Sequence, residues 1–273
     1  MPRKEVALRA GPLLAVLLIA AASGLVCAAC SGGSRGGGGA PVAAEELVAQ
    51  VVTSYPHDAG ASTEGLIWHQ GKLYESTGIT NASSLRRVDL TTGAVEQRVD
   101  LESPLYGEGL ERIGGELVQL TWFDGRALVW DLGFTRLREH TYTGEGWGLC
   151  HDGARLIMSD GSDRLVFRDP VTFQPLGELR VTRDGRPQTQ LNELEWAEGR
   201  LWANLWQEER ILRIDPASGQ VTGWVDGTGL LTPQERAASD VLSGIAWAPE
   251  RGTFLITGKR WPRLFEVRFV PRP

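Results

Sequence analysis

A repeated unit of short strands constrains the fold of this sequence more than any other feature. Two short apolar segments, joined by a turn of Gly, Asp or Pro, form a hairpin that recurs along the chain. The five copies begin near residues 65, 109, 148, 194 and 244, and most are followed by a third strand, as at 85–89 and 211–215. A period of about 40–50 residues in strand-rich units is typical of β-propeller blades.

Five such units occupy nearly all of the chain after residue 45 and predict an all-β fold, a five-bladed β-propeller. Each blade needs neighbours on both faces, and closing the ring removes the free ends. The last copy ends with the strand 264–269, so its outer strand is missing. We expect the segment 47–52, which precedes the first copy, to supply that strand and close the ring. The regularity of the repeat argues against a β-sandwich, the alternative fold.

The first 29 residues are typical of a signal peptide. Arg3 and Lys4 precede an apolar run at 13–26 that is too short for a comfortable membrane span. Cys30 fits the lipidated position of a bacterial lipoprotein, with ordinary cleavage near Ala29 as the alternative. We therefore expect an exported protein, periplasmic or on the cell surface.

Residues 30–44 are expected to form the lipid tether and a flexible linker rich in Gly and Ser, followed by one propeller domain at 45–273. The serine after Cys30 favours the outer membrane. The lipid anchor would be the only membrane contact, and a closed propeller is expected to be monomeric.

Composition excludes several classes of partner and site. Cys150 is the only cysteine after the export segment, so an internal disulfide is not expected in the domain. The net charge of −6 is mild and both signs are interspersed, which argues against nucleic acid or an anionic membrane surface as the main partner. The four histidines have no zinc-ligand spacing.

The unusual residues gather at one predicted mouth of the ring. The innermost strand of a blade starts at that mouth and the second strand returns to it. Carboxylates, tryptophans, an amide and a lysine occupy these positions: Glu64, Tyr106, Glu108, Trp122, Trp147, Asn192, Trp206 and Lys259. Taken singly, the tryptophans could pack between blades and the charged groups could be solvated. Their convergence favours a small-ligand site, because such sites combine apolar walls with a few fixed polar groups.

These rim segments resemble the β-propeller glutaminyl-peptide cyclotransferases of plants and bacteria. The resemblance runs in order from about residue 51 to 267, and its matching stretches are 62–66, 74–78, 106–110, 146–149, 159–161, 191–195, 202–207, 244–247 and 257–262. It implies that Glu108 is the key catalytic residue, that Asn192 and Lys259 belong to the active site, and that three tryptophans line the pocket, namely Trp122, Trp147 and Trp206.

Two positions depart from the plant pattern: Ser62 replaces an aromatic residue and Glu64 stands in place of Gln. We expect Glu64 and Tyr106 to contribute to substrate binding.

The resemblance implies an enzyme that cyclises N-terminal glutamine of peptides or proteins to pyroglutamate and releases ammonia. One carboxylate, Glu108, could move the protons, and no cofactor is expected, although a structural metal in the channel stays open. A calcium-dependent, lactonase-like hydrolase is one alternative, with Glu64, Glu108, Asn192 and Glu193 as ligands. A non-catalytic surface-binding propeller is the other.

Overall fold

The computed structural model describes residues 43–273; the predicted signal peptide, Cys30 and the linker up to residue 42 lie outside the described residues. The described chain is an all-β fold of small sheets with one six-residue helix. None of its helices is long and apolar enough to cross a bilayer.

Three antiparallel sheets of four strands each follow one another along the chain. The strands of the first are β2 (Thr63–His69), β3 (Lys72–Thr77), β4 (Ser84–Val88) and β5 (Val95–Asp100). Those of the second are β6 (Gly107–Ile113), β7 (Glu116–Thr121), β8 (Arg126–Asp131) and β9 (Arg136–Thr141). Those of the third are β10 (Leu149–His151), β11 (Leu156–Ser159), β12 (Arg164–Arg168) and β13 (Pro175–Arg180).

The remaining long strands form an eight-stranded sheet that consists of two runs of four. One run is β16 (Leu191–Ala197), β17 (Arg200–Leu205), β18 (Arg210–Ile214) and β19 (Val221–Asp226). The other is β20 (Leu242–Ala248), β21 (Thr253–Gly258), β22 (Arg263–Pro271) and the N-terminal strand β1 (Glu45–Pro56). A two-stranded hairpin, β14 (Thr182–Arg183) and β15 (Arg186–Pro187), lies between the third sheet and this one.

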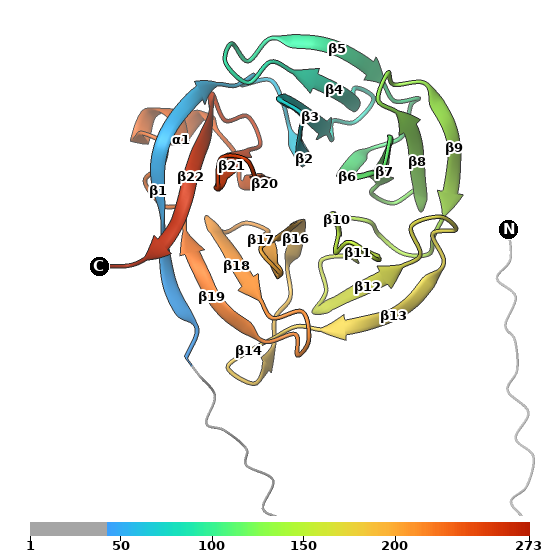
Figure 1. The fold of residues 1–273 in the computed structure, drawn as a ribbon. Helices are drawn as coiled ribbons and strands as arrows, with labels where there is room; N and C mark the ends of the chain where they lie inside the picture. The colour runs from blue at the N-terminus through green and yellow to red at the C-terminus, as the bar shows by residue number, and fades with distance from the viewer. Residues whose placement is uncertain (1–42) are drawn as a thin grey trace, which may run out of the picture. The chain divides into compact units, whose positions relative to one another are not determined.

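The expected pairing of segment 47–52 with the last strand is present. β1 runs antiparallel to β22, with Val51 opposite Val267, and parallel to β19, with Leu47 opposite Val225. The N-terminal strand therefore lies beside the C-terminal one and joins the two runs of the eight-stranded sheet (Figure 1).

The innermost strands of the five runs contact one another in the circular order β2, β6, β10, β16, β20 and back to β2 (Figure 1). Glycines permit this close approach. A Cβ atom on Gly65 would lie 2.5 Å from the backbone nitrogen of Leu110, and one on Gly148 would lie 2.2 Å from the carbonyl oxygen of Asn192. The glycines near the starts of the repeat copies are thus explained by contact between neighbouring strands.

Apolar side chains fill the spaces between adjacent sheets. One cluster brings Leu85 and Tyr74 of the first sheet against Leu117 and Leu128 of the second. Cys150 is buried and unpaired in another cluster. Packing between sheets is therefore what holds the described chain together.

The one helix, α1 (Pro233–Ala238), precedes β20 and was not anticipated from the sequence. A capping box starts it: Thr232 accepts from the backbone N–H of Glu235, whose side chain accepts from the backbone N–H of Thr232. At six residues, the helix is too short to produce a helical period.

Candidate functional site

A cavity of about 210 Å³ opens where the innermost strands begin. Its lining consists of the eight residues singled out from the sequence: Glu64, Tyr106, Glu108, Trp122, Trp147, Asn192, Trp206 and Lys259. The structure brings these residues together around one cavity, although they belong to five separate strand runs. The cavity is smaller than the 300–1,000 Å³ typical of drug-sized ligands and suits one small group.

Irregular strand starts aim the polar residues into this cavity. The pairing of β2 with β3 shifts register between Thr63 and Gly65, which leaves Glu64 out of the ladder. β6 and β16 shift at the corresponding place and leave Glu108 and Asn192 unpaired with their neighbouring strands. A bulge of this kind re-aims a side chain, and bulges are common beside active sites.

Glu64 and Lys259 form a buried ion pair on one side of the cavity. The Nζ atom of Lys259 lies 2.7 Å from Oε1 of Glu64, whose side chain is 1% exposed. The hydroxyl of Tyr106 donates to the same oxygen at 3.1 Å. Tyr106, just before β6, and Lys259, just after β21, thus meet at the carboxylate of Glu64.

The two carboxylates of the cavity differ in how easily they ionise. Burial raises the pKa of Glu64 to about 7, while Lys259 opposes the rise. Burial also raises the pKa of Glu108, well above its usual range, and the negative charge of Glu64 adds to the effect. Because Lys259 contacts Glu64 directly, Glu108 is the carboxylate that more readily keeps a proton.

Lys259 remains a cation. Burial alone lowers the pKa of its ammonium group, but the charges of Glu64 and Glu108 outweigh burial, and the net shift is upward. The cavity therefore contains a fixed positive charge beside a carboxyl group poised to exchange a proton.

Aromatic side chains form much of the remaining cavity wall. The Trp147 and Trp206 rings meet edge to face, with their centroids 5.6 Å apart. The rings of Tyr106 and Trp122 are 5.4 Å apart, and Phe123, largely exposed, stacks on Trp122. This wall can surround a small polar group and exclude water from it.

Glu145, which the sequence did not single out, orients two of the three tryptophans. Its Oε2 atom accepts from Nε1 of Trp122 at 2.7 Å and from Nε1 of Trp147 at 2.9 Å. The two indoles come from different sheets, so this carboxylate fixes the wall across the gap between them. In the sequence, Glu145 is visible only as a charged residue shortly before Trp147, and such residues are also common on protein surfaces.

Replacing Glu145 by alanine should therefore loosen the wall. We expect KM for a Gln-initiated peptide to rise about tenfold, equivalent to about 1.4 kcal/mol, because both indole N–H groups lose a charged acceptor. Glu145→Gln, which retains a carbonyl acceptor, should raise KM less. Steady-state kinetics of the two variants measure the difference; equal KM values for Glu145→Ala and the wild type would show that the wall does not need this anchor.

Asn192 brings an uncommitted donor to the cavity. The residue is 3% exposed, and its Nδ2 atom has no hydrogen-bond partner among residues 43–273. Its backbone carbonyl accepts from the hydroxyl of Ser159 at 2.7 Å, which fixes the strand start. A buried donor without a partner is costly unless a ligand supplies one.

Glu193, a calcium ligand in the alternative interpretation, makes a backbone contact instead. Its Oε1 atom accepts from the backbone N–H of Leu66 on β2 at 3.2 Å. Glu193 thus ties two innermost strands together at a point where the other copies have glycine.

Comparison with known proteins gives concordant matches. The profile of the family described as glutamine cyclotransferase matches residues 18–269. The chain is 38% identical over 226 residues to a glutaminyl-peptide cyclotransferase of Arabidopsis thaliana, covering 80% of this chain and 70% of that protein. The crystal structure of Myxococcus xanthus glutaminyl cyclase superposes with a TM-score of 0.77 at 39% identity, covering 84% of this chain and 100% of that one.

Proposed function

Because this chain belongs to the glutamine cyclotransferase family, we propose that its cavity is the active site, in which Glu108 moves the protons of glutamine cyclisation. The reaction closes N-terminal glutamine of a peptide into pyroglutamate and releases ammonia. The observation that carries the assignment of the site is the meeting of Glu108, Lys259 and Asn192 with three tryptophans around one small cavity.

The reaction is intramolecular, so the cavity must fix a rotamer rather than bring two molecules together. The α-amine attacks the side-chain carboxamide carbon, which forms the ring C–N bond and later breaks the bond to the amide nitrogen. The tryptophan wall is placed to hold the carboxamide in the folded rotamer and to keep water from competing with the amine.

Glu108 is proposed to act first as base and then as acid. The α-ammonium, with a pKa near 8, must lose a proton before it attacks, and the departing amide nitrogen must gain one. A carboxylate with a raised pKa suits both steps, because it holds the proton between them and releases it to the leaving nitrogen. The attacking nitrogen loses its second proton to solvent as the carbonyl re-forms; one proton thus passes through Glu108 to the leaving nitrogen, ammonia departs and Glu108 is again a carboxylate.

Lys259 and Asn192 are proposed to stabilise the negative charge that develops on the carboxamide oxygen. Both carry N–H donors into the cavity, and Nδ2 of Asn192 has no partner among the described residues. Preorganised donors in a site that excludes water are worth more than donors in bulk solution. Because these residues supply the acid, the base and the oxyanion donors, we propose that the reaction requires no cofactor.

Glu64 is proposed to hold Lys259 in place and to set the pKa of Glu108. We expect Glu64→Gln to move the acidic limb of the kcat/KM profile to lower pH. The negative charge of Glu64 raises the pKa of Glu108, and its removal also frees Lys259 to stabilise the Glu108 carboxylate. Both effects lower that pKa, so Glu108 would ionise at lower pH. A pH–rate profile measures the shift; an unchanged or upward-shifted limb would contradict this role.

The assay for the proposed function is ammonia release from a Gln-initiated dipeptide by residues 40–273, with and without a chelator. Release that persists with the chelator, together with formation of the pyroglutamyl product, is the expected result. No release by the folded domain would overturn the assignment of the activity, and release abolished by the chelator would overturn the proposal that no cofactor is required.

We also propose that the sheets are the blades of a five-bladed propeller that β1 closes. The circular contacts of the five innermost strands and the pairing of β1 with β22 support this architecture. Contacts between neighbouring strands close the ring within one chain, so we propose that the protein is a monomer. Sedimentation can test this oligomeric state.

Export and lipidation at Cys30 complete the proposal, in a periplasmic or cell-surface location that favours the outer membrane. The apolar run followed by cysteine and serine supports them. Metabolic labelling with a radioactive fatty acid should label the full chain but not a Cys30→Ser variant; equal labelling of both would exclude this attachment site.

A further inference from the structure

We propose that His57 is a positioning residue for the active site: it is buried outside the cavity lining as a doubly protonated imidazolium and holds the segment that carries Lys259. The proposal rests on the role assigned to Lys259 above. His57 follows β1 and lines no part of the cavity, and none of the preceding assignments uses it.

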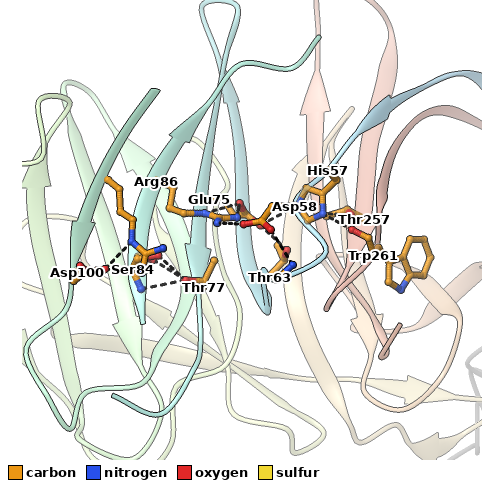
Figure 2. Close-up of polar contacts among 12 residues, drawn as sticks. His57, Asp58, Thr63, Glu75, Thr77, Ser84, Arg86, Asp100, Thr257 and Trp261 are labelled. Atoms are coloured by element: carbon orange, nitrogen blue, oxygen red, sulfur yellow. Dashed lines mark hydrogen bonds and ion pairs between the residues drawn. The ribbon is translucent and has the colours of Figure 1, made fainter. Parts of the chain in front are cut away.

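Both ring nitrogens of His57 face hydrogen-bond acceptors. Nδ1 lies 2.7 Å from the carbonyl oxygen of Trp261, and Nε2 lies 3.1 Å from Oε1 of Glu75 (Figure 2). A carbonyl oxygen has no proton to give. Nδ1 must therefore carry a hydrogen, and the same is true of Nε2 if Glu75 is ionised.

The surroundings of Glu75 keep it ionised. Arg86 donates to its Oε2 atom through Nε at 3.1 Å and also through Nη2, and Thr63 donates to Oε1 at 2.5 Å. Burial raises the pKa of Glu75, while the Arg86 guanidinium and the Thr63 hydroxyl lower it whatever the protonation state of His57. A carboxylate that accepts from three donors has no proton to offer to His57 (Figure 2).

The other contacts of Nδ1 agree with this proton assignment. The hydroxyl of Thr257 lies 3.4 Å from Nδ1, and its proton is committed to the carbonyl of Arg263 at 2.9 Å. Thr257 can therefore only accept from the ring. Each polar atom near Nδ1 is then an acceptor, which a neutral imidazole with a bare Nδ1 could not satisfy.

Charge in this cluster is balanced. The titratable groups that face the ring are Glu75 on β3 and Arg86 on β4, and Arg86 also pairs with Asp58 at 2.7 Å. Two cations, His57 and Arg86, thus oppose two carboxylates. Burial lowers the pKa of His57 and Arg86 adds to this, but Glu75 outweighs both and the net shift is upward.

The cluster connects to both halves of the Glu64–Lys259 pair. Trp261, whose carbonyl accepts from His57, is two residues after Lys259, and Thr63, which donates to Glu75, directly precedes Glu64. Between them, the backbone N–H of Arg260 donates to the carbonyl of Ala61 at 2.6 Å. Loss of the ring would free the Trp261 carbonyl, and loss of one ring proton would leave either that carbonyl or the Glu75 carboxylate without its donor. Either change would allow the Lys259 segment to shift.

The protonation state can be read directly from the whole domain. In ¹⁵N-histidine NMR at pH 7.5, one of the four histidines should show hydrogens on both ring nitrogens. This signal should be absent from His57→Gln and present in His69→Gln, a control at the far end of β2. A neutral tautomer assigned to His57 at this pH would overturn the proposal without reference to activity.

A double-mutant cycle tests the route through Lys259. His57→Gln should lower kcat by about 10–100-fold, the cost of a small misplacement of a catalytic group, and His69→Gln should not. His57→Gln combined with Lys259→Met should be no slower than Lys259→Met alone, because the misplaced group is then already missing. Multiplicative losses would show that His57 acts elsewhere. If Lys259→Met alone has no effect, the role of Lys259 itself fails.

Glu75→Gln provides a second variant if His57→Gln does not fold. It retains the shape of Glu75 but removes the charge that keeps His57 protonated, so the pKa of His57 falls. His57 would then lose its second ring proton at a lower pH than in the wild type. The alkaline decline of kcat should therefore begin at a lower pH in this variant. An alkaline limb unchanged by Glu75→Gln would overturn the proposal.

Discussion

Glu108→Gln is expected to lower kcat for ammonia release by about 10²–10⁴-fold, the usual contribution of general acid–base catalysis. Glutamine has nearly the same shape as glutamate and fills the same space at the start of β6, but it can neither accept the proton of the α-ammonium nor deliver it to the leaving nitrogen. Since Glu108 is only 6% exposed, water is poorly placed to take over this role.

The same substitution should not destabilise the fold. The pKa of Glu108 is raised by burial, so its contribution to stability is present at low pH and is lost as pH rises through the folded-state pKa. Glutamine has no charge to bury. We therefore expect the Tm of Glu108→Gln at pH 8 to equal or exceed that of the wild type, which separates lost catalysis from lost folding.

Glu111→Gln is the matched control. Glu111 lies on the same strand, and burial raises its pKa to about 7, but it lines a different cavity together with Trp247 and Glu195. Its substitution should change kcat less than about twofold, well below the catalytic effect. Ammonia release by Glu108→Gln within tenfold of the wild type, or an equal loss in Glu111→Gln, would contradict the assignment of Glu108 as the proton shuttle.

The position of the site could be predicted because the repeat shows the direction of each strand as well as its existence, and so the edge of the sheet at which each strand begins or ends. In consecutive antiparallel hairpins, the start of each first strand and the end of each second strand lie at the same edge. Glu108 and Lys259 occupy these two kinds of position, and both line the cavity. That these two positions share one edge followed from the order of strands in the repeat alone, without knowledge of any contact.

What the sequence could not show depends on contacts between segments outside the repeat. His57 precedes the first copy, and its partner Trp261 is 204 residues away, so no local pattern relates them. Glu145 lies in the loop before β10, where a carboxylate is usually solvated, and only the approach of the neighbouring sheet brings Trp122 within reach. Glu193 stands where the other copies have glycine. The sequence shows this break in the repeat but not the residue that Glu193 contacts.

Lys259→Met should lower kcat by about 10²–10³-fold, the effect of removing one oxyanion donor. Methionine preserves the apolar stem of lysine but removes the ammonium group, which is the counter-charge of Glu64 and the proposed donor to the substrate oxygen. The loss should appear mainly in kcat, because the donor acts on charge that develops only in the transition state.

Its pH profile should shift in the direction opposite to that of Glu64→Gln. The positive charge of Lys259 lowers the pKa of both cavity carboxylates, so its removal raises them, and the acidic limb of kcat/KM should move to higher pH. Lys259→Arg, which retains a cation but with a planar and bulkier head group, should leave the limb closer to that of the wild type while kcat still falls.

Combining Lys259→Met with Glu64→Gln separates the catalytic from the structural role of the pair. Removing one partner of a buried ion pair leaves an uncompensated charge, typically at a cost of about 3–5 kcal/mol, whereas removing both avoids that cost. The double variant should therefore recover stability in chemical denaturation relative to Lys259→Met, yet remain as slow. Recovery of activity together with stability would show that Lys259 only neutralises Glu64 and does not act on the substrate.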